Sequence, residues 1–333
     1  MRAIVIGDGG SLELREVPTP EPGPGQARVR VRACGVNRAD LLQRRGLYPA
    51  PADAPQDIPG LEIAGEVEAV GSGTTDVRSG DRVYGIVSGG AYAEAVVVHA
   101  RTLAPIPSVS GKPLGFVEAA AIPEAFLTAY DAMIVQCGLA AGETVVVHAV
   151  GSGVGTAAVQ IARAIGARPI GTARSQEKLE RARGLGLHAG IALEVNPDGS
   201  PRFAARVREA TDGRGADVVL ELVGGAYVPE SLASLAERGR VVLVGLMAGA
   251  RAAVDLGLVL RRRLRVFGTV LRSRPLEEKI LAGRILARNI SPLVGEGKLV
   301  PVVDRVLPLD RALEAQDLMA SNANFGKIVL QVD

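Results

Sequence analysis

The chain has no tryptophan, and aromatic residues make up only 3% of its 333 residues. A surface on which nucleic-acid bases stack needs aromatic side chains, so a broad stacking platform is excluded. Excess charge of one sign is also missing, because 38 Lys and Arg residues and 36 Asp and Glu residues leave a net charge of +2. This balance gives no bulk attraction to nucleic acid or to an anionic membrane. The basic run RRRLR at 261–265 is better explained as a solvated helix end than as a nucleic-acid patch.

Cysteine and histidine are few and scattered. Cys34 and Cys137 lie far apart and form no C-x-x-C pair, so they cannot build a disulfide framework. We expect two buried free thiols in a reducing compartment. His99, His148 and His188 stand in separate blocks, and no pair has metal-ligand spacing. His148 ends an apolar segment, which favours a structural imidazole over a catalytic base.

Long apolar runs are absent as well. No run of eighteen apolar residues occurs, and Met1 is followed by RAIVIG, which is typical of a first strand rather than of a charged leader. The sequence therefore predicts a soluble cytoplasmic protein without a membrane partner.

The length favours two domains, since one hydrophobic core rarely serves more than about 250–300 residues. Hydrophobic residues make up 47% of the chain, and 41 glycines indicate many tight turns. Residues 1–121 contain short apolar runs separated by Gly and Pro signals such as PTPEPGPG, which predicts a mostly antiparallel β domain. A helix is expected around EAAAIPEAFLTAYDAM, with Pro123 near its start.

Strands then alternate with helical stretches. The predicted strands are Thr144–His148, Arg168–Thr172, Gly190–Leu193, Asp217–Leu222, Arg240–Gly245 and Arg265–Thr269. Six strands joined by crossovers predict an α/β fold with a doubly wound parallel sheet. A helix over Arg274–Asn289, a short β segment, a further helix and the strand KIVLQV complete the chain.

A glycine-rich turn joins the first of these strands to a helix. HAVGSGVG is followed by Ala158, Ile161, Ala162 and Ile165 at helical spacing. A diphosphate can approach bare backbone amides at such a helix N-terminus, where the helix dipole favours negative charge. The glycines give G-x-G-x-G rather than G-x-G-x-x-G, and a variant register through small residues is an alternative. The turn and its context predict a dinucleotide-binding site rather than a merely tight turn.

The residues after the second strand of this sheet indicate which dinucleotide binds. An acidic residue there would bind the ribose hydroxyls of NAD, but the chain has GTARS at 171–175. Arg174, and Lys178 one helical turn later, offer two cations for a 2′-phosphate. NADP(H) is therefore predicted, with two solvated surface charges as the alternative.

Several blocks of the sequence together resemble a known family. They are ACGVNRADLLQRRGLYP, PGLEIAGEVEAVGSG, GDRVYGI, AAAIPEAFLTAY, HAVGSGVGTAAVQIARAIGA, GLMAG, VLRSR and GKIVL. They resemble the zinc-free, zeta-crystallin-like quinone oxidoreductases of the medium-chain dehydrogenase/reductase superfamily, particularly the branch of the tumour-suppressor-induced quinone reductase. The resemblance implies a GroES-like catalytic domain over 1–121 and 270–333 and a Rossmann domain over 122–269. It also implies an active site between the domains and a homodimer formed through the Rossmann sheet edge at Arg265–Thr269.

The ligands of the zinc-dependent relatives are missing. Where those relatives carry Cys and His, this chain has Asn37 and Leu61, with Glu62 following, and it has too few cysteines for a structural zinc lobe. No metal is predicted. Without a Lewis acid for alcohol oxidation, hydride delivery to an electron-poor acceptor is the easier reaction.

By resemblance, Asn37 and Thr128 lie near the nicotinamide and Tyr48 lies in the acceptor pocket. Each has an alternative from the residues alone: Asn37 as a helix cap, Tyr48 as a packed turn residue and Thr128 bonded within its own helix. The cofactor-binding residues predicted from the turn and the resemblance are Ser152, Gly153, Val154, Gly155, Arg174, Lys178, Gly245, Leu246, Met247, Val270, Leu271 and Asn322. Leu193 stands where relatives often place a Tyr against the adenosine phosphate, which weakens the NADP prediction.

Three functions remain open from the sequence. The first is an NADPH-dependent, zinc-independent quinone reductase, in which the cofactor carries the hydride. The second is an enone or enoyl-thioester reductase on the same scaffold. The third is a protein that binds the dinucleotide without turnover.

Overall fold

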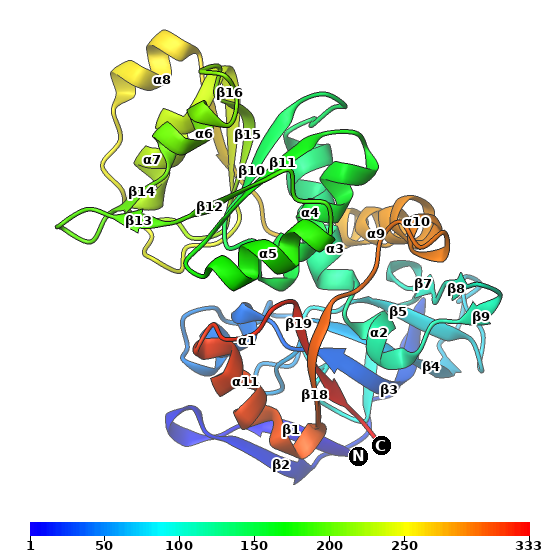
Figure 1. The fold of residues 1–333 in the computed structure, drawn as a ribbon. Coiled ribbons are helices and arrows are strands. Elements are labelled where there is room, and N and C mark those ends of the chain that lie inside the picture. Colours follow the sequence, from blue (N-terminus) through cyan, green and yellow to red (C-terminus); the bar gives the residue numbers. More distant parts are fainter. The chain divides into compact units, whose positions relative to one another are not determined.

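The computed structural model describes all residues from Met1 to Asp333. It contains two compact units, described separately below and coloured along the sequence in Figure 1. Unit 1 comprises Met1–Leu127 and Leu271–Asp333, and unit 2 comprises Thr128–Val270. The first division falls inside helix α3 (Pro123–Tyr130). None of the helices combines the length and apolarity that a membrane span requires.

Unit 1 is built on a seven-stranded sheet in the order β18-β19-β3-β4-β5-β7, with β6 paired to β3. Its pairs are antiparallel except β18 with β19. The strands are β3 (Gln26–Gly35), β4 (Glu62–Val70), β5 (Arg82–Ile86), β6 (Ala95–His99), β7 (Ala104–Pro105), β18 (Val303–Pro308) and β19 (Lys327–Gln331). Two short hairpins, β1 (Arg2–Ile6) with β2 (Leu12–Glu16) and β8 (Ser108–Val109) with β9 (Lys112–Pro113), flank this sheet. The predicted, mostly antiparallel β domain is thus confirmed.

The helices of unit 1 are short. They are α1 (Arg38–Arg44), α2 (Phe116–Ala120), the start of α3, α9 (Leu276–Ile285), α10 (Ser291–Gly295) and α11 (Ala312–Ala320), with 3-10 turns at Asp8–Gly10, Ala100–Thr102 and Leu309–Arg311. The single helix expected around EAAAIPEAFLTAYDAM is divided, because α2 ends before Pro123 starts α3. Proline lacks an amide hydrogen and crowds the preceding turn, so it suits the first position of a helix. α9 continues as a π-helical segment, Leu286–Ile290.

Unit 2 is a six-stranded parallel sheet in the order β12-β11-β10-β15-β16-β17. Its strands are β10 (Thr144–Val147), β11 (Arg168–Ala173), β12 (Ala189–Ala192), β15 (Ala216–Glu221), β16 (Leu235–Leu243) and β17 (Arg265–Gly268). Its helices are the rest of α3, with the π-helical segment Asp131–Gln136, then α4 (Gly153–Ala164), α5 (Gln176–Gly184), α6 (Ala204–Glu209), α7 (Tyr227–Ser234) and α8 (Leu256–Arg262). A small hairpin joins β13 (Glu194–Val195) to β14 (Pro201–Arg202). All six predicted strands and the doubly wound topology are confirmed.

The strand order reverses between β10 and β15. From β10 the chain first moves outward through β11 and β12, and then outward on the other side through β15, β16 and β17. Residues Val145–Val147 are fully buried, as expected for a central parallel strand. Open α/β sheets bind ligands at the carboxyl ends of the strands next to such a reversal. The topology therefore places the candidate ligand edge after Val147 and Glu221.

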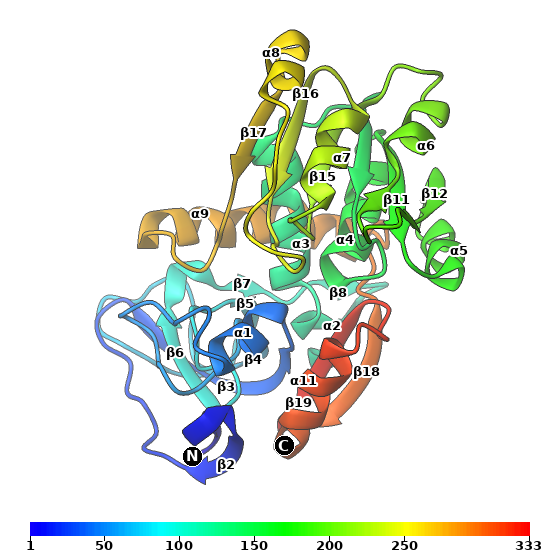
Figure 2. The same cartoon turned by 90° about the vertical axis from the view of Figure 1, so that its left-hand side faces the viewer.

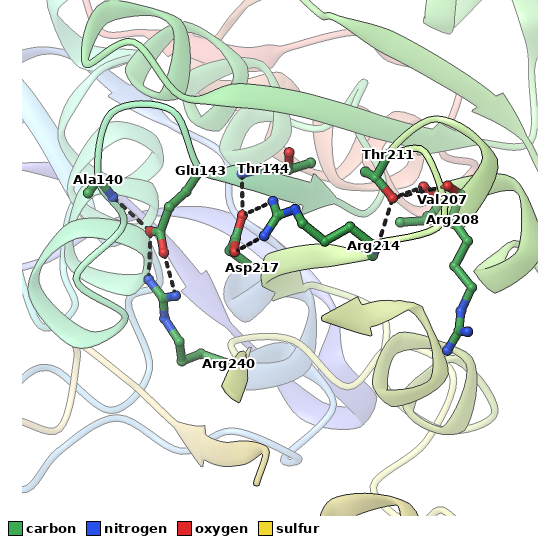
Figure 3. A network of polar contacts seen from close by, with 10 residues as sticks. Ala140, Glu143, Thr144, Val207, Arg208, Thr211, Arg214, Asp217 and Arg240 are labelled. Atoms are coloured by element: carbon green, nitrogen blue, oxygen red, sulfur yellow. Dashed lines mark hydrogen bonds and ion pairs between the residues drawn. The ribbon is translucent and has the colours of Figure 1, made fainter. Parts of the chain in front are cut away.

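Ion pairs occupy the opposite edge of this sheet, where the strands begin (Figure 3). Arg240 donates two hydrogen bonds of 2.8 Å to Glu143, just before β10, and they hold the pKa of Glu143 below its ordinary value. Arg214 pairs with Asp217, which also accepts a hydrogen bond of 2.8 Å from the Thr144 amide. These contacts tie β10, β15 and β16 together at the edge away from the glycine turn.

The basic run at 261–265 is engaged locally. Arg262 donates to two backbone carbonyls, Arg261 pairs with Asp255 at 3.5 Å, and Arg263 pairs with Glu237. The run ends α8 and starts β17, which supports the helix-end interpretation. Both cysteines are free and buried, as expected.

Candidate functional site

The glycine turn presents unpaired amides at the carboxyl end of β10. Ser152 caps α4 by accepting a hydrogen bond of 3.0 Å from the Gly155 amide. The amides of Gly153 and Val154 donate to no protein acceptor. Gly155 is required sterically, because an added Cβ would lie 2.5 Å from the carbonyl oxygen of Ala149. Free amides at the start of a twelve-residue helix match the requirements of a diphosphate.

His148 lies beneath this turn in a fully buried polar chain. Its Nδ1 is 2.8 Å from the Thr172 hydroxyl, and its Nε2 is 2.9 Å from the Ser231 hydroxyl. Ser231 in turn donates to Glu221 at 2.6 Å. Burial lowers the pKa of His148, so the imidazole is neutral at neutral pH. The structure supports the structural interpretation of His148.

Glu221 is a supporting residue that the sequence analysis did not single out. The second oxygen of its carboxylate accepts hydrogen bonds of 2.9 Å from the amides of Val223 and Gly224. It thereby fixes the loop after β15, beside the reversal point. The available signal was an acidic residue at the end of the apolar run DVVLE.

Arg174 follows β11 directly. Its side chain is exposed and has no protein hydrogen bond or ion pair, and Lys178 is half-buried one turn into α5. Tyr227, at the start of α7, is a neighbour that the sequence analysis missed. Burial raises the pKa of Tyr227, and the positive charge of Arg174 opposes that rise. Leu193 is half-buried against the core of unit 2 and offers no polar group to a phosphate.

The remaining predicted cofactor residues fall in several loops. Gly245 follows β16, where an added Cβ would lie 2.4 Å from the carbonyl oxygen of Leu222, and the adjacent Leu246 and Met247 are about half exposed. Val270 follows β17 and is exposed, whereas Leu271 is buried. Asn322 belongs to unit 1, has a φ of 57° and accepts a hydrogen bond of 2.7 Å from Arg38.

In unit 1, Asn37 is the N-cap residue of α1, as one alternative expected, and its side chain also belongs to a buried ionic cluster. Its amide nitrogen donates to Glu62 at 2.9 Å, and its amide oxygen accepts from Lys327 at 2.6 Å. Lys327 also pairs with Glu62 at 2.6 Å, with both side chains almost completely buried. Gly35 makes room for this cluster, since an added Cβ would lie 2.1 Å from the Glu62 carboxylate. The cluster fixes the Asn37 amide in one orientation.

Asp40 completes the start of α1. Its carboxylate accepts hydrogen bonds from the backbone amide of Asn37 at 2.8 Å and from the Tyr92 hydroxyl at 3.0 Å. Burial raises the pKa of Asp40 to about 6, an effect that these hydrogen bonds and the charge of Lys327 oppose.

Tyr48 lies in the loop after α1 and is held by Arg272. The Arg272 guanidinium lies 5.4 Å from the centre of the Tyr48 ring and donates to the Tyr48 carbonyl at 3.2 Å. It also donates to Gln43 at 2.6 Å and to the Ser88 carbonyl at 2.8 Å. The Tyr48 hydroxyl makes no hydrogen bond to the protein, so it is available to a ligand.

Thr128 lies in α3 and is the first residue of unit 2. Its side chain is 8% exposed, and its hydroxyl makes no hydrogen bond, so the alternative of bonding within its own helix is wrong.

No group of three or more His, Cys, Asp or Glu side chains is arranged to hold a metal ion. At the positions of the zinc ligands in relatives, Asn37 is engaged as described and Leu61 is a buried aliphatic residue.

Two family models match the chain. Residues 23–108 match the alcohol dehydrogenase GroES-like domain, and residues 153–285 match the zinc-binding dehydrogenase model. The chain is 39% identical over 307 residues to polyketide synthase GfsB of Streptomyces halstedii, covering 90% of this chain but only 5% of that protein.

Two further matches extend over almost the whole of the proteins compared. The quinone oxidoreductase of Rattus norvegicus is 31% identical over 303 residues, which cover 90% of this chain and 86% of the relative. A crystal structure of Escherichia coli quinone oxidoreductase complexed with NADPH superposes with a TM-score of 0.85 at 29% identity, covering 99% of this chain and 98% of the other. The chain therefore belongs to the quinone oxidoreductase family of the medium-chain dehydrogenase/reductase superfamily.

Proposed function

We propose that the protein is an NADPH-dependent reductase that transfers a hydride to a quinone without zinc. The observation that carries this proposal is the pair of free amides at the start of α4, at the reversal point of the sheet. Arg174, with no acidic residue beside it at the end of β11, favours the 2′-phosphate of NADP. The NADPH complex of the Escherichia coli relative supports the same cofactor.

In this proposal the two units have different tasks. Unit 2 binds the diphosphate through Gly153 and Val154 and the adenosine phosphate through Arg174. Unit 1 contributes the fixed amide of Asn37 and the free hydroxyl of Tyr48, which can donate to a carbonyl oxygen of the acceptor. Bound NADPH supplies the hydride.

We propose zinc independence because the polar groups at this place in unit 1 already have hydrogen-bond partners. Both oxygens of Glu62 already accept hydrogen bonds, from Asn37, Lys327 and the amide of Glu124, and Leu61 has no ligand atom. We expect prolonged dialysis against a chelator to leave the reduction rate unchanged. Loss of activity that added zinc restores would contradict this expectation.

An acceptor screen tests the function. NADPH oxidation by purified protein is followed with simple quinones and, separately, with 2-enones and enoyl thioesters. We expect turnover with quinones. The match to a segment of a polyketide synthase, a class of enzyme that handles acyl thioesters, favours the enoyl reductase as the second candidate. Activity on enoyl substrates alone would replace the quinone assignment, and NADPH binding without any turnover would identify a non-catalytic protein.

The Arg174→Ala substitution is expected to weaken NADPH binding about 10- to 100-fold, the range for losing a charge-assisted hydrogen bond to phosphate. NADH binding is expected to stay within twofold, because NADH lacks the 2′-phosphate. Titration followed by the fluorescence of the reduced nicotinamide, or calorimetry, measures both, and Lys178→Ala is compared in the same way. Arg183→Ala, an exposed arginine near the other end of α5, is the matched control. An unchanged ratio of NADPH to NADH affinity would contradict the role of Arg174.

We also propose a homodimer formed through the β17 edge of the unit 2 sheet. β17 pairs only with β16, so its other side is open (Figure 2). Val266 on this strand is 44% exposed, and Leu256 and Leu260, one turn apart on α8, are 75% and 78% exposed. An open strand edge beside apolar side chains is suited to pairing with a second copy.

The Val266→Lys substitution is expected to shift the protein from dimer to monomer in light scattering, because two buried lysines would repel across a two-fold axis. Val195→Lys, at a 69% exposed position on the small hairpin, is expected to leave the dimer intact. A wild-type monomer would refute the proposal.

A further inference from the structure

Glu124 is an acidic residue whose carboxylate has no partner although it is not exposed to solvent like the unpaired Glu118. It is the second residue of α3 and half-buried, and its side chain accepts no hydrogen bond and forms no ion pair. Its backbone amide, in contrast, donates to Glu62 at 2.8 Å. Glu62 is the same carboxylate that holds Asn37 and Lys327. The main chain of Glu124 is therefore fixed to the ionic cluster, while its carboxyl group remains available.

Charged and titratable groups surround this carboxyl from several elements. Glu62 on β4 and Asp40 on α1 disfavour its ionised form, whereas Lys327 on β19 and Arg272 favour it. Burial is the largest influence, and together these effects raise the pKa of Glu124 to about 8. The carboxyl therefore carries its proton at neutral pH.

The charge of the same carboxyl acts on Tyr48. Burial raises the pKa of Tyr48, and the charge of Glu124 raises it further, so the two side chains interact electrostatically. The Tyr48 hydroxyl is also free of protein hydrogen bonds. Tyr48 and Glu124 are thus two groups of unit 1 that can donate hydrogen bonds, have no partner within the protein and influence each other electrostatically.

From this arrangement we propose that Glu124 donates the proton that completes reduction of the acceptor, an inference that rests on the proposed function. A quinone that receives a hydride, with its two electrons, from NADPH becomes a hydroquinone monoanion. The O–H bond of the Glu124 carboxyl breaks as an O–H bond forms on the anionic oxygen of the acceptor. Solvent then returns a proton to the Glu124 carboxylate, so one quinone, one NADPH and one proton give one hydroquinone and one NADP⁺.

The proposal predicts a specific dependence on pH. Glu124 can donate only while protonated, so the kcat of the wild type is expected to fall as pH rises through about 8. Glu124→Gln keeps the size and polarity of the side chain but cannot donate an acidic proton. We expect it to lower kcat about 100-fold, within the range for losing a general acid, and to abolish this fall.

The experiment measures NADPH oxidation by 1,4-benzoquinone from pH 6 to 9.5, with the rate without enzyme subtracted. Glu118→Gln, an exposed position on α2, is the control and is expected to match the wild type. NADPH affinity, measured by fluorescence, is expected to stay within twofold in Glu124→Gln. If that variant fails to fold, Glu124→Asp takes its place: retention of the fall with a lower kcat supports proton donation, and unchanged kinetics overturn it.

The outcomes separate the two proposals. A wild type that reduces quinones and a Glu124→Gln variant with the same kcat and the same pH profile would overturn the role of Glu124 and leave the proposed function standing. A wild type that binds NADPH but reduces no acceptor would overturn the proposed function itself.

Discussion

Replacing Lys327 with methionine is expected to lower the free energy of unfolding by about 3–5 kcal/mol, the range for breaking a buried ion pair from one side. Lys327 donates to Glu62, Asn37 and the Val36 carbonyl at 2.6, 2.6 and 2.9 Å. Without the ammonium group, the fully buried carboxylate of Glu62 has no countercharge in contact. Urea denaturation followed by circular dichroism measures the loss.

Two further variants test whether the unpaired charge is the cause. Lys298→Met removes a lysine that pairs with Glu296 at 2.7 Å but is 61% exposed, and it is expected to cost less than about 1 kcal/mol. Adding Glu62→Gln to Lys327→Met is expected to recover a large part of the loss, because the uncompensated charge is removed. Equal losses in Lys327→Met and Lys298→Met would show that the cluster does not stabilise the fold.

The Gly155→Ala substitution is expected to weaken NADPH binding by about 100-fold or more, equivalent to losing two hydrogen bonds to charged phosphate oxygens. The added methyl would meet the Ala149 carbonyl oxygen at 2.5 Å and backbone atoms of Val150 at 2.8 Å. None of these atoms can rotate away, so the turn must move and carry the amides of Gly153 and Val154 with it. Calorimetric titration with NADPH measures the effect.

The control for Gly155→Ala is Gly184→Ala at the end of α5. An added Cβ there meets nothing within 4 Å, and the residue is helical, so alanine is expected to be neutral or slightly stabilising. NADPH affinity equal to the wild type in both variants would show that the glycine turn does not hold the diphosphate.

The sheet of unit 2 could be predicted because local signals were sufficient. Apolar runs separated by helical periodicity defined all six strands, and the predicted bounds lie within two residues of those observed except at the start of β16. Leu235 already pairs with Ala216 there, before the register shifts and the ladder resumes at Arg240. The residues before Arg240 include Glu237, Arg238 and Gly239, which are not typical of a strand.

The supporting residues of the site were harder to predict because their partners are distant in sequence. Lys327 lies 290 positions from Asn37, and Arg272 lies 229 positions from Gln43. Each was visible only as a charged residue within or beside an apolar run, in GKIVL and VLRSR. A buried charge of this kind requires a partner, but spacing along the chain cannot identify it. Tyr227, whose neighbour Arg174 is distant in the sequence, was missed for the same reason.

The central claim is that unit 2 holds the diphosphate of NADPH on the bare amides at the start of α4. A crystal structure of the protein with NADPH tests it most directly. We expect phosphate oxygens within hydrogen-bonding distance of the Gly153 and Val154 amides, with the 2′-phosphate on Arg174. A dinucleotide bound elsewhere, or a diphosphate separated from these amides, would contradict it.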